Sequence, residues 1–171
     1  MKTRFDFVTN SSSSSFILAF ESKEDGYSKI AAMTKKYGSD YVGKLLEDFE
    51  VTQPIPREML YDHVKDDLEG LAYMEICYGN DWWWSSEKPT FKNRWMKAHP
   101  DAEYEDFYKS EEFISEKERL IKHYFEKLLD RIGNCSHIIE LKYEDHDDVG
   151  SELEHRILPD CDFTAQSFSH H

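Results

Sequence analysis

Two features that would place this chain in a membrane or outside the cell are missing from its sequence. No apolar run approaches the ~20 residues that a membrane-spanning helix needs. The start of the chain has no basic region followed by an apolar core, which is the pattern of a secretory signal peptide. We therefore expect no membrane span and no membrane partner.

Cysteine is also scarce. Cys77, Cys135 and Cys161 are scattered along the chain, and no Cys-x-x-Cys pair occurs. An odd, scattered set argues against a disulfide framework and is typical of a reducing compartment, where cysteine serves as a small buried side chain. We expect a cytoplasmic protein.

Positive charge is in deficit. The chain carries 21 basic residues against 35 acidic ones, a formal net charge of −14. Such a chain repels the phosphates of a nucleic-acid backbone, so we expect no double-stranded nucleic acid as a partner. The charge suits a cationic partner, a metal ion, or solubility alone.

A dense polar segment stands near the start of the chain. Two apolar runs, residues 5–8 and 16–20, flank a threonine, an asparagine and five consecutive serines. Because aromatic and β-branched residues favour strands, the segment predicts a strand, a serine loop and a second strand. The loop could hold a phosphate with its hydroxyls and N–H groups, or the hydroxyls could close turns on their own backbone. The candidate ligand-binding residues are Asn10, Ser11, Ser12, Ser13, Ser14 and Ser15.

No Gly-Lys-Ser/Thr occurs, so this segment is not a Walker phosphate loop. Residues 2–16 instead resemble the opening of a loose group of small bacterial and phage-borne proteins. Those proteins begin with Lys-x-Arg-x-x-Phe-Val-Ser/Thr-Asn, a serine run and a phenylalanine, and a weaker similarity recurs in residues 150–159 and 169–171. The resemblance implies a bacterial or phage origin and an intracellular setting, and it implies no catalytic residue.

Helical periodicity dominates the middle of the chain. Ser22 opens a pattern that resembles a capping box, and Gly38 is placed to end the helix that follows. The clearest helix has apolar residues at i, i+3 and i+4 over about six turns. The expected helices cover residues 22–37, 39–49, 56–72, 110–132 and 149–158, with a short helix or turn at residues 101–108. Later strands are expected at residues 136–143 and 163–168.

These elements predict an α/β fold, with α+β as the alternative. We expect one mixed sheet of about four strands from both chain ends, packed by about five helices. A chain of 171 residues fits a single domain. Residues 22–133 would form a helical section inserted between the N-terminal strand pair and a C-terminal strand–helix–strand unit.

A second polar cluster, Glu144-Asp145-His146-Asp147-Asp148, follows the strand expected at residues 136–143. Ligands of α/β proteins gather where strands hand over to helices. Asp148, Glu152 and His155 would share one helical stripe, and such donors suit a divalent transition metal. The alternative is a solvated acidic turn with a polar helix face. The candidate metal ligands are Asp145, Asp147, Asp148 and His155, with Zn²⁺ or Mn²⁺ as the cofactor.

Histidines near this cluster are candidates for moving protons near neutral pH. We take His146 and His170 as candidate catalytic residues, on the expectation that the chain end returns to the same sheet edge. The alternative for the terminal pair is a remnant of a cloning tag. No His-x-x-x-His or His-Glu-x-x-His motif supports a zinc enzyme.

Three adjacent tryptophans, Trp82, Trp83 and Trp84, cannot all point inward from one regular element. At least one is expected on the surface, as an interface anchor or a stacking platform for a base. The alternative is a loop anchored to the core by two of the tryptophan rings.

Two functions follow from these patterns. The first is binding of a small anionic, phosphate-bearing ligand at the serine loop, with metal-dependent hydrolysis as an extension in which a metal polarises the phosphoryl group. The second is a non-catalytic acidic interaction module, a phage or mobile-element inhibitor that covers a basic surface of a host protein. In that case tryptophans would anchor the contact and carboxylates would steer it.

Overall fold

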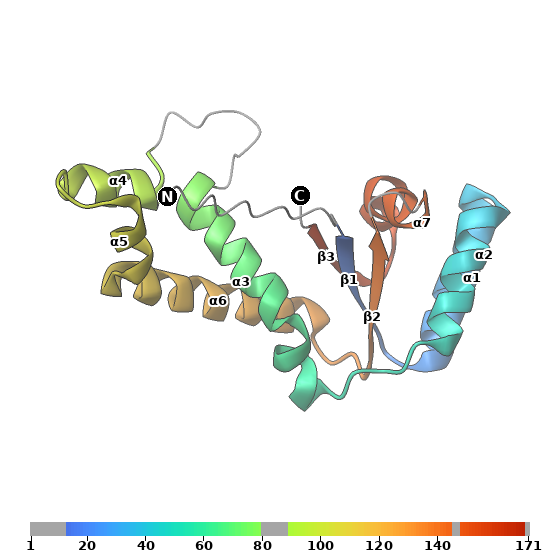
Figure 1. Cartoon of the computed structure of the whole chain (residues 1–171). Coiled ribbons are helices and arrows are strands. Elements are labelled where there is room, and N and C mark those ends of the chain that lie inside the picture. The colour runs from blue at the N-terminus through green and yellow to red at the C-terminus, as the bar shows by residue number, and fades with distance from the viewer. Residues whose placement is uncertain (1–12, 80–88, 145–147, 170–171) are drawn as a thin grey trace. The chain divides into compact units, whose positions relative to one another are not determined.

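The computed structural model describes residues 13–79, 89–144 and 148–169 (Figure 1). The chain divides into two compact units, which we call the sheet unit (residues 1–59 and 132–171) and the helical unit (residues 60–131). Each is described by itself. The two helices directly after the first described strand, at residues 23–37 and 39–51, belong to the sheet unit.

The sheet unit contains a three-stranded sheet in its described part, with the strand order β2-β1-β3. Its strands are β1 (Ser13–Phe20), β2 (His137–Glu144) and β3 (Thr164–Ser169). Both neighbours pair antiparallel with β1, which is therefore the central strand (Figure 1). The expected α/β class is confirmed, and so is the pairing of segments from the two chain ends. The expected mixed sheet is wrong for the described residues, because all three of their strands pair antiparallel. The strand expected at residues 5–8 lies outside the described residues.

Helices cover one face of this sheet. They are α1 (Lys23–Tyr37), α2 (Ser39–Val51) and α7 (Asp148–Glu152). Alternate residues of β1 point to this face, because side chains alternate along a strand: Phe16, Leu18 and Phe20 are all buried there. They pack with buried side chains of the helices and β2, among them Ile30, Val42, Leu45, Phe49, Ile139, Leu141 and Leu153.

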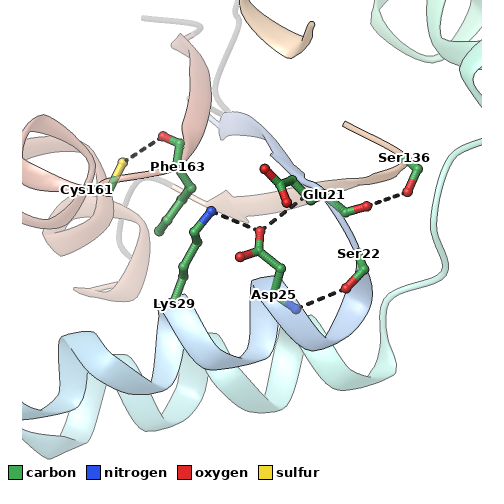
Figure 2. A network of polar contacts seen from close by, with 7 residues as sticks. All are labelled: Glu21, Ser22, Asp25, Lys29, Ser136, Cys161 and Phe163. Atoms are coloured by element: carbon green, nitrogen blue, oxygen red, sulfur yellow. Dashed lines mark hydrogen bonds and ion pairs between the residues drawn. The ribbon is translucent and has the colours of Figure 1, made fainter. Parts of the chain in front are cut away.

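The start of α1 is fixed by the hydrogen bonds that its sequence predicts. The Ser22 hydroxyl accepts a hydrogen bond from the N–H of Asp25 at 3.2 Å, and the Asp25 carboxylate accepts one from the N–H of Glu21 at 3.2 Å (Figure 2). The Lys29 ammonium donates to the same carboxylate at 2.9 Å, which lowers the pKa of Asp25. Side-chain oxygens thus satisfy N–H groups that have no partner inside the helix.

The same end of the sheet holds a buried histidine. His137 begins β2 opposite Phe20 and is 9% exposed, with its ring 5.3 Å from that of Phe49. Burial lowers the pKa of His137, and the nearby Lys23 lowers it further while Glu24 opposes the change. The fold therefore favours the neutral imidazole at this position.

The C-terminal helical segment is less regular than its sequence pattern predicts. The expected continuous helix over residues 149–158 is wrong: α7 ends at Glu152, a π-helical turn follows at Leu153–Ile157, and a 3-10 turn at Leu158–Asp160. Pro159 accounts for the final change, because proline lacks the N–H that a continuing helix needs. Wider π turns also alter which side chains share a stripe.

The helical unit consists of α3 (Leu60–Tyr78), α4 (Phe91–Ala98), α5 (Tyr104–Lys109) and α6 (Glu111–Ile132) in the described part of the chain. Polar pairs join α3 to α6: Lys117 donates to Glu69, and Tyr124 donates to Glu75. Phe107 of α5 is fully buried and lies 5.4 Å from the Trp95 ring and 5.1 Å from the Phe113 ring. This aromatic contact packs α5 between α4 and α6.

Candidate functional site

The register of the sheet brings the serine segment beside the strand end that leads into the acidic cluster. Ser13 pairs with Glu144, the last residue of β2, and Ser14 pairs with Ser169, the last residue of β3. The two predicted polar clusters therefore begin at one end of one sheet. This end is the place where the sequence predicts a shared site.

The serines themselves are placed differently from the prediction. Ser13, Ser14 and Ser15 belong to β1, so the expectation that these three residues form a loop is wrong. The physical reason is that strands on both sides supply partners for their backbone groups, which extends the strand beyond its apolar part. Asn10, Ser11 and Ser12 lie outside the described residues, and the ligand-binding role of all six remains a prediction.

The two serine side chains that are described are buried, and they point to opposite faces of the sheet because side chains alternate along a strand. Ser14 is 8% exposed and Ser15 is 3% exposed. The Ser15 hydroxyl donates to Oε1 of Glu140 at 2.9 Å, and the Lys142 ammonium lies 3.1 Å from the same oxygen. This hydroxyl already serves a carboxylate of the protein, and a phosphate placed here would meet that negative charge.

The predicted metal ligands are only partly within the described residues. Asp148 begins α7 and His155 lies exposed in the π turn. Glu152, on the same predicted stripe, accepts a hydrogen bond from Arg156 at 3.1 Å. Within the described ranges, no three His, Cys, Asp or Glu side chains gather as a metal-binding group. The remaining candidates lie outside these ranges: Asp145, His146, Asp147, His170, Trp82, Trp83 and Trp84.

A cluster that the sequence analysis missed lies in the helical unit. The Lys92 ammonium on α4 donates to the Tyr104 hydroxyl on α5 at 2.7 Å, and the Tyr108 hydroxyl donates to the same oxygen at 2.9 Å. The hydroxyl of Tyr73, on α3, lies 3.3 Å from that of Tyr108. We call Tyr73, Lys92, Tyr104 and Tyr108 the tyrosine–lysine cluster.

Charge and burial shift the pKa values of two of these phenols in opposite directions. Hydrogen bonds from Lys92 and Tyr108 lower the pKa of Tyr104, whereas burial raises the pKa of Tyr108 far above its ordinary value. Burial by itself lowers the pKa of Lys92, but the hydrogen bond to Tyr104 and the neighbouring phenols outweigh it and leave this pKa raised. Neighbouring groups with opposed pKa shifts are typical of functional sites.

Residues 101–112, which include the exposed member of this cluster, are strongly acidic. Residues 101–112 contain six carboxylates and a single basic residue, Lys109, and all six acidic residues are exposed. Tyr104 is 50% exposed among them, and Ile114 on the first turns of α6 is 47% exposed. We call this set the acidic–tyrosine surface: Asp101, Glu103, Tyr104, Glu105, Asp106, Glu111 and Glu112.

The polar contacts of this surface leave most of its charge unneutralised. Asp106 accepts a hydrogen bond from the N–H of Glu103 at 2.9 Å, which caps α5. Glu105 lies 4.0 Å from Lys109, and both side chains are about three-quarters exposed (74% and 75%). An ion pair so exposed contributes little attraction, and residues 101–112 carry a formal net charge of −5 beside the single ammonium of Lys92 on Tyr104.

No family model, curated protein or solved structure matches the chain. None of the helices in the described ranges is long and apolar enough to cross a membrane. A function for this chain therefore has to be argued from its own residues.

Proposed function

We propose that the protein is a binding module whose acidic–tyrosine surface docks onto a basic surface of a partner protein. The observation that supports this most strongly is the density of exposed charge. Six carboxylates stand against one lysine over residues 101–112. Their field attracts a cationic surface and speeds its association.

Exposed aromatic and aliphatic side chains give such a contact something to bury. Tyr104 stands within the carboxylates and Ile114 follows them, each about half exposed (50% and 47%). Tyrosine is enriched at the energetic centres of protein interfaces because it combines a large apolar ring with a polar hydroxyl. Charge would steer the partner, and these side chains would hold it.

A fluorescent hexalysine peptide tests the charge part of this proposal. The variant Asp101→Asn/Glu105→Gln/Glu112→Gln removes three charges from the surface. We expect its Kd for hexalysine, measured by fluorescence anisotropy at low salt, to rise roughly five- to tenfold, because exposed charges attract most strongly when salt does not screen them.

A matched variant separates the surface from net charge. Asp66→Asn/Glu118→Gln/Asp130→Asn also removes three charges, all exposed and all within the helical unit. We expect its Kd to change by less than about twofold. Equal weakening by both triple variants would show that hexalysine responds to overall charge, and the proposal would then be wrong.

The second candidate function is binding of a small anionic ligand at the serine end of the sheet. The register that places Ser13 beside Glu144 and Ser14 beside Ser169 favours it, because both predicted clusters begin there. The contact of Ser15 with Glu140 opposes it. Within the described ranges no three His, Cys, Asp or Glu side chains gather as a metal-binding group, so we derive no hydrolytic step through a metal.

A further inference from the structure

The Tyr104 hydroxyl has an unusual hydrogen-bonding position. Its oxygen accepts from the Lys92 ammonium at 2.7 Å and from the Tyr108 hydroxyl at 2.9 Å. A hydroxyl has one proton to donate and two lone pairs to offer, so both lone pairs are engaged. The Tyr104 proton has no acceptor in the described part of the chain and is the one that a ligand or base could take.

Tyr108 is the second hydrogen-bond donor to Tyr104. Its hydroxyl donates to the Tyr104 oxygen at 2.9 Å, and it lies 3.3 Å from the Tyr73 hydroxyl, where either oxygen can be the donor. Burial raises the pKa of Tyr108. Tyr108 is therefore protonated at neutral pH and has a proton to donate to Tyr104.

Lys92 supplies the charge that favours a phenolate at Tyr104. Its ammonium lies 4.6 Å from the centre of the Tyr104 ring and 5.5 Å from that of Tyr78. These contacts hold a cation against aromatic faces. A hydrogen bond from a charged donor to an oxygen that gains negative charge is stronger than a neutral one.

Tyr104 is also accessible, which separates it from the buried members of the cluster. Half of its surface is exposed, 50%, whereas Tyr73 and Tyr108 are partly covered. Two of the neighbouring carboxylates have partners of their own: Asp106 accepts a hydrogen bond from the N–H of Glu103, and Glu105 lies 4.0 Å from Lys109. Their negative charge still disfavours an anionic reagent here, so a neutral or cationic one fits this site.

We propose that Tyr104 is a nucleophilic phenol, activated by Lys92 and Tyr108, that accepts the acyl group of a neutral or cationic activated acyl donor. In this step the Tyr104 oxygen forms a bond to the acyl carbon, and the bond from that carbon to its leaving group breaks. The phenolic proton passes to water before the attack, and the leaving group takes up a proton from water as it departs. Lys92 and Tyr108 stabilise the phenolate oxygen before it attacks, and they remain unchanged. This site shares Tyr104 with the acidic–tyrosine surface, but its test uses no docking partner and can fail or succeed without the docking function.

N-Acetylimidazole, a neutral acyl donor, tests this directly on the whole protein near pH 7.5. It transfers its acetyl group to a phenolate and releases imidazole. We expect Tyr104 to be acetylated roughly three- to tenfold faster than Tyr27 and Tyr41. Each unit by which the pKa of a phenol falls raises its phenolate fraction about tenfold, but a less basic phenolate is also a weaker nucleophile, which reduces the gain in rate. Peptide mass spectrometry of one digest compares all three residues, which are exposed by 50%, 43% and 37%.

Variants identify the activating groups. We expect Lys92→Met to slow acetylation of Tyr104 to the rate of Tyr27, Lys92→Arg to retain most of it, and Tyr108→Phe to lower it in part. Lys109→Met removes a charge of the same sign from α5 and is expected to have no effect. If Tyr104 reacts no faster than Tyr27 in the unaltered protein, or if Lys92→Met leaves the ratio unchanged, the proposal is wrong. The ratio in the unaltered protein decides the matter even where a variant folds poorly.

Discussion

Replacing Phe20 by alanine is expected to lower the free energy of unfolding of the sheet unit by about 3–5 kcal/mol. Phe20 ends the central strand and is 1% exposed. Its ring lies 5.4 Å from that of Phe49 on α2 and 4.9 Å from that of Phe163, just before β3. The substitution removes a packing partner of both Phe49 on α2 and Phe163 before β3. It leaves a cavity, because the packed neighbours cannot move far enough to fill it.

Amide hydrogen exchange of residues 13–20, followed by mass spectrometry, measures this loss in the sheet itself. Because natural domains are stable by only about 5–15 kcal/mol, the strand should exchange much faster in the variant. Val51→Ala is the control, since Val51 is 74% exposed and such changes usually stay within about 0.5 kcal/mol. Unchanged protection of β1 in Phe20→Ala would contradict the packing described for this core.

Replacing Gly150 by alanine is expected to destabilise the sheet unit, by up to about 2 kcal/mol net. A Cβ at this position would lie 2.7 Å from the Cβ of Tyr143 on β2. Alanine is the better helix former by about 1 kcal/mol, but the clash outweighs this gain because Tyr143 Cβ is attached to the strand and cannot swing away. Forcing α7 off the sheet costs about 1–3 kcal/mol.

Gly43→Ala provides the matched control within a helix. Gly43 lies inside α2, and a Cβ there would meet nothing within 4 Å. The same substitution should therefore stabilise the protein by roughly 0.5–1 kcal/mol. Chemical denaturation followed by circular dichroism compares the two, and stabilisation by both alanines would show that α7 does not pack on β2 as closely as described.

Local signals in the sequence predicted much of the secondary structure. The serine at position 22 and the apolar spacing after it predicted α1, and Ser110 with the long apolar stripe predicted α6. The helix α4 was missed, although Thr90 caps it by accepting from the N–H of Asn93 at 3.1 Å. The threonine after a proline was the available signal for a helix start.

The end of the serine run shows why strand boundaries were harder to predict. Serine has no strong strand preference, and Ser13 to Ser15 become strand residues because β2 and β3 lie on both sides of them. Pairing of segments more than 120 residues apart in the sequence, as in the contact of Ser15 with Glu140, is a tertiary effect. No local pattern in the sequence reports it.

The tyrosine–lysine cluster was out of reach for a similar reason. Tyr104 and Tyr108 are four residues apart and share one face of α5, which the sequence does reveal. The approach of Tyr73 from α3 and Lys92 from α4 depends on how three helices pack. Only the fold shows where these rings and hydroxyls meet.

The docking proposal and the anion-binding alternative differ in both the binding surface and the charge of the ligand. The docking proposal places a cationic ligand on residues 101–112, whereas the alternative places an anionic ligand at the serine end of the sheet. The acidity of the chain and the hydrogen bond from the Ser15 hydroxyl to Glu140 favour the docking proposal. The two ligands can be compared on one labelled sample.

The most direct measurement is a pair of titrations of the ¹⁵N-labelled protein, one with hexalysine and one with inorganic phosphate, followed through the amide shifts. We expect hexalysine to shift the amides of residues 101–112 in a saturable, salt-sensitive way, and phosphate to leave those of Ser13, Ser14 and Ser15 unshifted. Saturable phosphate shifts at these serines, with no response of residues 101–112 to hexalysine, would contradict the proposed function and establish the alternative.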